Sequence, residues 1–369
     1  MSRSRRRLAV VSSEAWDAGA ARTLTWRIHV KHRTPAALAA LACLAGMAPT
    51  QAVAASDGAK HHAGYTFAVI GDVPYGQAQI EAFPKWVDEI NADPDVRLVQ
   101  HVGDIKNGST RCDDSYFASI KKQFDRFRDP LVYTPGDNEW TDCHRPNNGS
   151  YNPLERLSAV RSSFFAKKNT TNGRPQHIDG VNRAFPEIVT WRKAKVSFAA
   201  LHVVGSNDDL APWTGIGEKA ATPAQVAEQK ARMNTNLAAL RSTFADAKNH
   251  KSRAVAVSLQ ADMFDPTYDV PHENNTAFTP LVAELIKQSN AFHGPVYLIN
   301  GDSHVYTSDR PLASGSRWLS FYGVKVSANN LTRITVDGSD NNKDWLKVSV
   351  TDSPAVLEWS RVPYRTQAG

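Results

Sequence analysis

The sequence has few cysteines, no internal repeat, no low-complexity block and no apolar run long enough for a membrane span. The absence of repeats and of low-complexity blocks argues against an array of several domains. With 369 residues, 41% of them hydrophobic, the chain can bury a substantial core. We expect one domain over residues 56–369, preceded by an N-terminal extension and leader over residues 1–55.

The part of the chain that follows the leader also lacks a formal net charge. The whole chain carries a formal charge of +6, a balance that would suit nucleic acid. However, residues 1–54 hold eight Lys and Arg residues against two acidic residues, which leaves 35 basic and 35 acidic residues for the rest. Because the basic charge belongs to the leader, no nucleic-acid partner is expected.

The N-terminal region has the pattern of a secretory leader. Basic residues precede an apolar run over residues 36–48, and a small-residue sequence follows at residues 52–55. The run is well short of the roughly 20 residues that a bilayer span needs. We therefore expect cleavage after Ala54 or Ala55 and a periplasmic or secreted mature chain without a stable membrane span. An uncleaved anchor and lipid attachment through Cys43 are the alternatives.

Five short apolar runs, rich in β-branched residues, end in nearly the same way, and four of them finish in Gly-Asp. The runs cover residues 67–72, 99–104, 131–137, 254–262 and 296–302. Composition alone would give about one or two Gly-Asp pairs in no particular context. Each run is typical of a buried strand, and the glycine would let the backbone turn sharply beside a ligand.

Helical patterns separate these predicted strands. Apolar residues recur at helical spacing from Ile80 to Ile90 and from Phe117 to Phe127. A longer helix is predicted to begin at Thr222, where Gln225 would complete a capping box. Strands without helices follow at the C-terminal end. Alternating strands and helices followed by strands alone indicate a layered α/β domain with a mixed, two-sheet core.

The acidic residues that end the runs are expected to lie together. The carboxyl ends of strands in an open α/β sheet meet at one crevice. Several carboxylates in that space would repel one another unless a cation lay between them, so the pattern predicts a site for divalent metal ions. For any one Gly-Asp pair, an ordinary turn after a strand is the alternative.

Removal of the leader leaves two cysteines, Cys112 and Cys143. An even pair in an oxidising compartment favours a disulfide, with two unrelated thiols as the alternative. Cys112 follows the second run and Cys143 follows the third run by similar intervals, so their loops should be neighbours. We expect the bridge to brace the rim of the crevice.

In the order and spacing of the five apolar runs and the residues that end them, residues 65–306 resemble the calcineurin-like metallophosphoesterases, which include the purple acid phosphatases. The resemblance implies a two-layer β-sandwich core flanked by helices, with mixed sheets. It also implies a two-metal site that activates water against a phosphate ester of a small substrate.

The resemblance further implies two groups of metal ligands that share Asp104. The first group is Asp72, Asp104, Asn107 and His304, and the second is Asp104, Asp137, Gln260 and Asp302. Asn107 stands where purple acid phosphatases have a tyrosine, and Pro74 replaces a family histidine and cannot ligate. Oxygen donors predominate, so two divalent or mixed-valence ions such as Mn, Fe, Mg or Ca are expected in preference to Zn.

Asn138 departs from the family pattern. A histidine normally stands at this position and helps to stabilise the transition state or to protonate the leaving group. An amide can donate a hydrogen bond but cannot transfer a proton at neutral pH. His101 and His144 are possible replacements or ordinary packing residues, and residues 205–208 either reach the crevice or form a plain turn. We expect an exported metal-dependent phosphoesterase in which Asn138 contacts the substrate. The alternative is a non-catalytic protein of this fold that binds a metal or a phosphorylated ligand.

Overall fold

The computed structural model describes residues 64–367 except residues 268 and 270. The expected leader over residues 1–55, its cleavage site and Cys43 lie outside the described residues. No helix within the described part of the chain is long and apolar enough to cross a bilayer.

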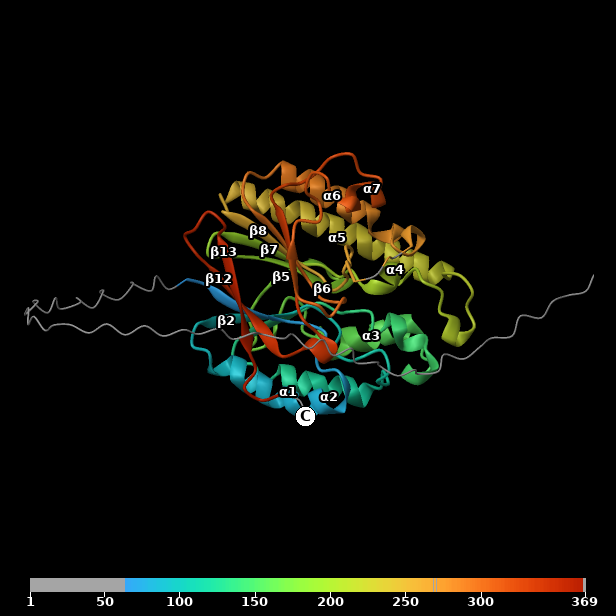
Figure 1. The fold of residues 1–369 in the computed structure, drawn as a ribbon. Helices are drawn as coiled ribbons and strands as arrows, with labels where there is room; N and C mark the ends of the chain where they lie inside the picture. The colour runs from blue at the N-terminus through green and yellow to red at the C-terminus, as the bar shows by residue number, and fades with distance from the viewer. Residues whose placement is uncertain (1–63, 268, 270, 368–369) are drawn as a thin grey trace, which may run out of the picture. The chain divides into compact units, whose positions relative to one another are not determined.

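Two mixed β-sheets form the centre of the fold (Figure 1). The first has the strand order β13-β12-β1-β2-β3-β4 and the second has the order β10-β11-β9-β8-β7-β6-β5. The first sheet comprises β1 (Thr66–Ile70), β2 (Val96–His101), β3 (Pro130–Tyr133), β4 (Asn172–Gly173), β12 (Asp344–Val350) and β13 (Leu357–Pro363). The second comprises β5 (Asp179–Asn182), β6 (Phe185–Lys193), β7 (Val196–Ala200), β8 (Ala254–Ser258), β9 (Val296–Asn300), β10 (Thr307–Asp309) and β11 (Leu331–Thr335).

Parallel strands occupy the middle of each sheet. Strands β1, β2 and β3 pair in parallel, as do β7, β8, β9 and β11, whereas the outer strands pair antiparallel. All five apolar runs of the sequence are central parallel strands, namely β1, β2, β3, β8 and β9. The expected mixed α/β fold with two sheets is therefore confirmed.

Helices cover the outer face of each sheet (Figure 1). The helices on the first sheet are α1 (Gly76–Ala92), α2 (Asp114–Phe124) and α3 (Pro153–Phe164), and those on the second are α5 (Pro223–Asn249) and α6 (Thr279–Asn290). Two short segments, α4 (Gly205–Asp209) and α7 (Arg317–Phe321), lie in loops. The predicted capping box is present at the start of α5, where Thr222 Oγ1 accepts from the Gln225 N–H and Gln225 Oε1 accepts from the Thr222 N–H.

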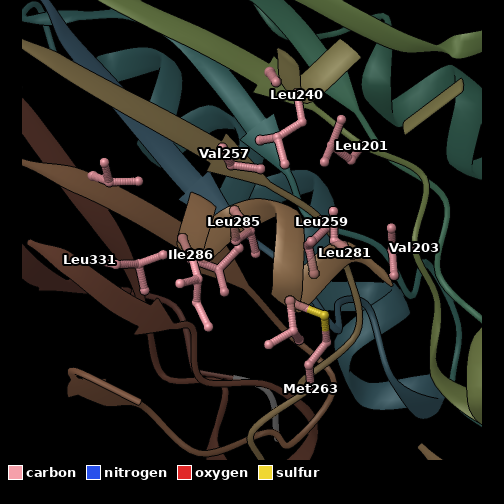
Figure 2. Close-up of a cluster of buried hydrophobic side chains, with 14 of the residues drawn as sticks. Leu201, Val203, Leu240, Val257, Leu259, Met263, Leu281, Leu285, Ile286 and Leu331 are labelled. Atoms are coloured by element: carbon pink, nitrogen blue, oxygen red, sulfur yellow. The ribbon is translucent and has the colours of Figure 1, made fainter. Parts of the chain in front are cut away.

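Alternating side chains of the strands fill three apolar layers. In β1, Phe67 and Val69 belong to a core that both sheets share, whereas Ala68 and Ile70 pack with the helices of the first sheet. This division follows from the two-residue period of a strand, which directs successive side chains to opposite faces. The third layer lies between the second sheet and its helices, where Val257 of β8 packs with Leu240 and Leu285 (Figure 2).

Candidate metal centre

The carboxyl ends of the parallel strands place acidic side chains from both sheets at one edge of the molecule. Asp72, Asp104 and Asp137 follow β1, β2 and β3 of the first sheet, while Asp302 and His304 follow β9 of the second. The three aspartates are buried, and Asp302 and His304 are partly exposed. The structure thus brings five of the seven predicted ligand residues together from distant parts of the sequence.

These five residues form two overlapping groups. Asp72, Asp104 and His304 each offer an atom within 4.8 Å of the others, and so do Asp104, Asp137 and Asp302. Asp104 belongs to both groups, as the family resemblance implies. Carboxylate oxygens with one imidazole nitrogen are a donor set that fits Mn, Fe, Mg or Ca, so the residues present suit the two ions that the resemblance predicts.

The backbone around the cluster is strained. Asp72, Asp104, Asp302 and His304 have φ values of 51°, 57°, 78° and 59°, in the left-handed region that residues other than glycine avoid. Each such residue costs of order 1–3 kcal/mol, which the surrounding structure must offset. Strain at four candidate ligands indicates that the fold is built to hold these side chains in one place.

The glycines of the Gly-Asp pairs leave room for the carboxylates. A Cβ atom on Gly136 would lie 2.1 Å from Asp104 Oδ1, and one on Gly301 would lie 2.2 Å from Asp72 Oδ2. Neither glycine has a positive φ. We expected these glycines to provide sharp turns, but at these two positions glycine is required because no side chain fits beside the ligand.

Burial and crowding shift the acid-base equilibria of the cluster. Burial, with the neighbouring carboxylates, raises the pKa of Asp104 and Asp302 well above the usual range of a carboxyl group. Burial and Asp142 raise the pKa of Asp137 to about 7. Although burial lowers the pKa of His304, the adjacent Asp72 carboxylate outweighs it and raises that pKa. Such a cluster is electrostatically suited to cations.

Gln260 lies in the cluster, but its oxygen faces away from the carboxylates. Gln260 Oε1 accepts from the Gly205 N–H at 2.8 Å, while Nε2 donates to Asp104 Oδ2 at 3.2 Å and to Asp137 Oδ1 at 3.3 Å. A backbone N–H can only donate, so this orientation of the amide is the one that satisfies both ends. In this structure the Gln260 side chain orients two carboxylates, and its role as a metal ligand stays a prediction.

Asn107 uses its side-chain oxygen within its own turn. Its Oδ1 atom accepts from the backbone N–H and hydroxyl groups of Ser109 and Thr110 at 2.8–3.1 Å. Asparagine commonly closes a turn in this way. The role of Asn107 as a metal ligand stays a prediction.

The hydroxyl group of Tyr75 contacts the cluster instead. It donates to Asp104 Oδ2 at 2.9 Å and lies 3.4 Å from Asp72 Oδ1. Tyr75 is not among the predicted site residues, because the family pattern directs attention to residues after Asp104. Its position three residues after Asp72 was the available signal.

Asn138 also holds Asp104. Its backbone N–H donates to Asp104 Oδ1 at 3.1 Å, and its Nδ2 donates to Asp104 Oδ2 at 3.0 Å and to the Tyr75 hydroxyl at 2.8 Å. Its carbonyl oxygen accepts from the buried Lys106 Nζ at 2.6 Å. Asn138 is thus at the cluster, and its contacts orient a ligand.

Neither candidate replacement histidine belongs to the two ligand groups. His101 is buried between Phe124 and Tyr133, and its Nε2 atom lies 2.9 Å from the Val73 carbonyl oxygen. It is therefore a packing residue. Its pKa is lowered to about 4 by burial. His144 Nδ1 accepts from the Gly215 N–H at 3.1 Å, so its ring is fixed by a loop.

Residues 205–208 do reach the crevice. The Ser206 hydroxyl lies 3.2 Å from both Asp137 Oδ2 and Asp142 Oδ1. Residues 206–209 all have left-handed φ values between 53° and 68°, so α4 is a left-handed turn. The buried ion pair between Asp208 and Arg232 of α5 fixes this turn against the helix.

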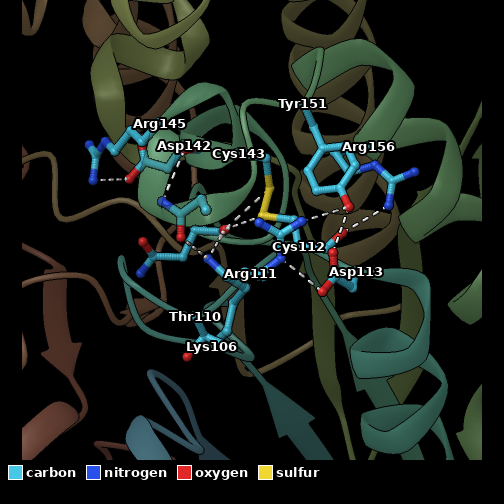
Figure 3. Close-up of a disulfide and its surroundings, with 12 residues drawn as sticks. Lys106, Thr110, Arg111, Cys112, Asp113, Asp142, Cys143, Arg145, Tyr151 and Arg156 are labelled. Carbon is cyan, nitrogen blue, oxygen red and sulfur yellow. Dashed lines mark hydrogen bonds and ion pairs between the residues drawn. A yellow bond between two sulfur atoms is a disulfide. The ribbon is translucent and has the colours of Figure 1, made fainter.

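A disulfide lies among the loops that also carry Arg145 (Figure 3), and its two sulfur atoms are 3.6 Å and 3.7 Å from the Asn138 carbonyl oxygen. The Cys112 and Cys143 sulfur atoms are 1.89 Å apart, with 5.9 Å between the Cα atoms, so the predicted pair is bonded in this structure. Arg145 Nη1 forms a 2.8 Å ion pair with the buried Asp142, and its side chain is 44% exposed. These loops therefore carry an arginine side chain that is held by an ion pair and is accessible to solvent.

The chain was compared with curated proteins, solved structures and family models. No curated protein matches the sequence. One similar solved structure is described as GAP50, the anchor in the inner membrane complex of Plasmodium, with 11% identity, a TM-score of 0.39, and coverage of 82% of this chain and 89% of that chain. Another is a 5'-nucleotidase precursor from Thermus thermophilus, with 10% identity, a TM-score of 0.41, and coverage of 81% of this chain and 54%, about half, of that chain. Residues 65–198 match the family model described as calcineurin-like phosphoesterase.

Proposed function

We propose that the mature chain is an exported metal-dependent phosphoesterase that uses two ions to hydrolyse the phosphate ester of a small substrate. The observation that carries the proposal is the position of Asp104 in both ligand groups. Two ions held by these residues would supply Lewis-acid chemistry, polarising the phosphoryl oxygens and lowering the pKa of bound water. The leader pattern and the Cys112–Cys143 pair support export.

Each of the two ligand groups would hold one ion. Asp72, Asp104 and His304 would hold the first, and Asp104, Asp137 and Asp302 the second. Around them, Gln260 and Asn138 donate hydrogen bonds to Asp104, which fixes the direction of its two oxygens. Such outer partners of a ligand typically contribute 10- to 100-fold in metal affinity or activity.

Arg145 is the side chain best placed to bind the substrate phosphate. Its Nη1 atom and Asn138 Oδ1 flank Gly108, since each would lie 3.4 Å from a Cβ atom built there. The ion pair with Asp142 directs the guanidinium group, and its exposure leaves donors free for an anion. Arginine suits phosphate because its planar group can donate two parallel hydrogen bonds.

A non-catalytic binding protein of the same fold is the second candidate. The observation that favours it is the position of Asn138, whose Nδ2 donates to Asp104 and to the Tyr75 hydroxyl. Within the two ligand groups of the described residues, His304 is the only histidine. This candidate would bind a metal ion or a phosphorylated ligand without turnover.

A hydrolysis screen on the metal-stripped, reloaded protein tests the proposal. Mature protein would be loaded with Mn²⁺, Mg²⁺, Ca²⁺ or iron and assayed on a panel of phosphomonoesters and phosphodiesters. We expect turnover with at least one ion, and an Asp104→Asn variant should lose more than the roughly 100-fold that removal of an outer partner costs. The exposed Asp125→Asn is the matched control. Metal and ligand binding without turnover by the wild type would favour the second candidate.

A further inference from the structure

A pocket lies at the amino-terminal edge of the parallel strands, opposite the edge that carries the metal centre. It has a volume of about 320 Å³, and Tyr65, Leu98 and Trp191 contribute to its walls. Tyr65 directly precedes β1, whereas Asp72 follows it. Seven residue steps of nearly extended chain span roughly 23 Å, so the pocket is a separate site. Ligand pockets typically have about 300–1,000 Å³, so this one has room for a small molecule.

Cationic side chains outnumber carboxylates on the walls of this pocket. The cations are Arg97, Arg174, Arg192 and Lys193, and the carboxylate is that of Asp179. Arg97 Nη1 donates to the Val96 carbonyl oxygen at 2.9 Å, which anchors the side chain without neutralising its charge. Lys193 forms no ion pair with a carboxylate in the part of the chain that the structure describes. Both charges are therefore available to a ligand.

The other two arginines are only loosely paired. Arg174 Nη2 lies 3.5 Å from Asp129 Oδ1, and Arg192 Nε lies 3.4 Å from Asp246 Oδ2. Both distances exceed the roughly 2.7–2.9 Å of a close charge-assisted hydrogen bond. A guanidinium group has five N–H donors, so each of these exposed side chains keeps donors for an anion.

Aromatic rings form the wall beside these cations. Trp191 stacks on the buried Phe198, with 4.9 Å between the ring centroids and 2° between the planes, and Tyr65 packs edge-on against the same Phe198 at 6.3 Å. The Trp191 indole nitrogen is buried and finds no hydrogen-bond acceptor among the described residues. The pocket thus combines fixed rings with polar groups that the protein itself does not use.

We propose that this pocket binds a small aromatic anion, with its ring against Tyr65 and Trp191 and its anionic group among the arginines. Arginine recognises carboxylate- and phosphate-like groups and stacks on flat rings, and aromatic side chains pack well on a ligand ring. A neutral ligand would leave the cations unused, and an anion without a ring would leave the aromatic wall unused. This binding site is independent of the proposed hydrolysis at the metal centre.

Calorimetry with naphthalenesulfonate tests the proposal, because this probe has a ring and an anionic group but no phosphate ester. Sulfate carries the charge without the ring, and naphthalenemethanol carries the ring without the charge. On metal-loaded mature protein, we expect naphthalenesulfonate to occupy a single site at least about 10-fold more tightly than either partial probe, as one hydrogen bond to a charged group would give. Equal affinity for either partial probe would overturn the proposal.

Variants at the two edges of the sheets locate the site. Arg174→Ala and Lys193→Ala should each weaken naphthalenesulfonate binding about 10-fold and leave the metal content unchanged. Arg145→Ala, at the metal-centre edge, is the matched control and should keep the affinity of the wild type. Unchanged affinity in both pocket variants, or an equal loss in Arg145→Ala, overturns the assignment of this pocket while the proposed function stands.

Discussion

Asp104 depends on its neighbours for the direction of both of its oxygens. Oδ1 accepts from the backbone of Asn138, and Oδ2 accepts from the side chains of Tyr75, Asn138 and Gln260. Hydrogen bonds to a carboxylate are stronger than those between neutral groups, so this shell fixes the shared ligand firmly. The residue that both ion sites need is thus the one most fully oriented.

Substitution of Arg145 should weaken substrate binding more than it slows turnover. A hydrogen bond to a charged group contributes about 1.5–3 kcal/mol, so Arg145→Ala should raise KM about 10- to 100-fold. Arg145→Lys should recover part of the loss because it keeps the charge but not the fork. Steady-state kinetics with the best substrate of the screen measures this.

The control for Arg145 is Arg111→Ala, because Arg111 is an exposed arginine that pairs with Asp113 near the same disulfide (Figure 3). It should leave KM unchanged. An equal increase of KM in both variants would indicate a general effect of positive charge and would contradict a specific role for Arg145.

Asp209 should make the stability of the protein depend on pH. The carboxyl group is fully buried, its Oδ1 accepts from Trp213 Nε1 at 3.0 Å, and burial raises its pKa to about 7. Because the folded pKa lies above the unfolded value of about 3.9, this group contributes its full stability below pH 4 and loses it as the pH rises to 7. The loss amounts to at most about 4 kcal/mol.

Asp209→Asn tests this dependence, since asparagine keeps the acceptor for Trp213 and tolerates the left-handed backbone. Relative to wild type, the unfolding free energy of the variant should rise between pH 4.5 and pH 8, as measured by urea denaturation. The exposed Asp125→Asn should show no such trend. A constant difference between Asp209→Asn and wild type across this range would show that Asp209 is ionised in the folded state.

At the scale of elements, strands and the capped helix α5 could be predicted because their signals are local. The runs that end in Gly-Asp gave β1, β2, β3 and β9 with the correct edge of the sheet, since the direction of parallel strands fixes where their ends meet. The capping box at Thr222 likewise depends on residues within one turn. Four ligand candidates, the aspartates of the Gly-Asp pairs, followed from this level of information, whereas His304 followed from the family resemblance.

The orientation and role of the remaining site residues depend on tertiary contacts that no local sequence pattern specifies. Whether Gln260 presents oxygen or nitrogen is decided by the Gly205 N–H, 55 residues away in sequence. The role of Tyr75 depends on the path of the loop after β1 relative to β2. The left-handed turn α4 depends on the ion pair between Asp208 and Arg232, so tertiary contacts outweigh the local preference for right-handed backbone.

The disulfide should stabilise the loops beside the metal centre. It joins residues 31 positions apart, and closing a loop of that length contributes roughly 3 to 4 kcal/mol in the chain-entropy model. The double variant Cys112→Ser, Cys143→Ser should lose about this much unfolding free energy in urea denaturation. The wild type under reducing conditions should lose the same amount. Equal stability of the oxidised wild type and the double variant would contradict this role.

At the scale of the whole described fold, the candidate metal centre joins the two sheets. Asp72, Asp104 and Asp137 come from the first sheet, and Asp302 and His304 come from the second. Ions bound here would therefore stabilise the packing of one sheet on the other, and any ligand that binds only the folded state raises its stability.

Removal of metal should accordingly lower the melting temperature. Stabilisation by one bound ion is about 2.7 kcal/mol when the free ion is at 100 times its Kd. We expect a chelator to lower the Tm of the wild type by several degrees and the missing ion to restore it. The Asp104→Asn variant should respond much less. An unchanged Tm after verified metal removal would contradict a structural link between the ions and the sheets.

The central claim, that two ions share Asp104, is tested most directly by the metal content of saturated, purified protein. Elemental analysis of the wild type, Asp104→Asn and the control Asp125→Asn gives the number of ions per chain after unbound metal is removed. We expect two ions per chain in the wild type and in Asp125→Asn, and at most one in Asp104→Asn. Two tightly bound ions in Asp104→Asn, or fewer than two in the saturated wild type, would contradict it.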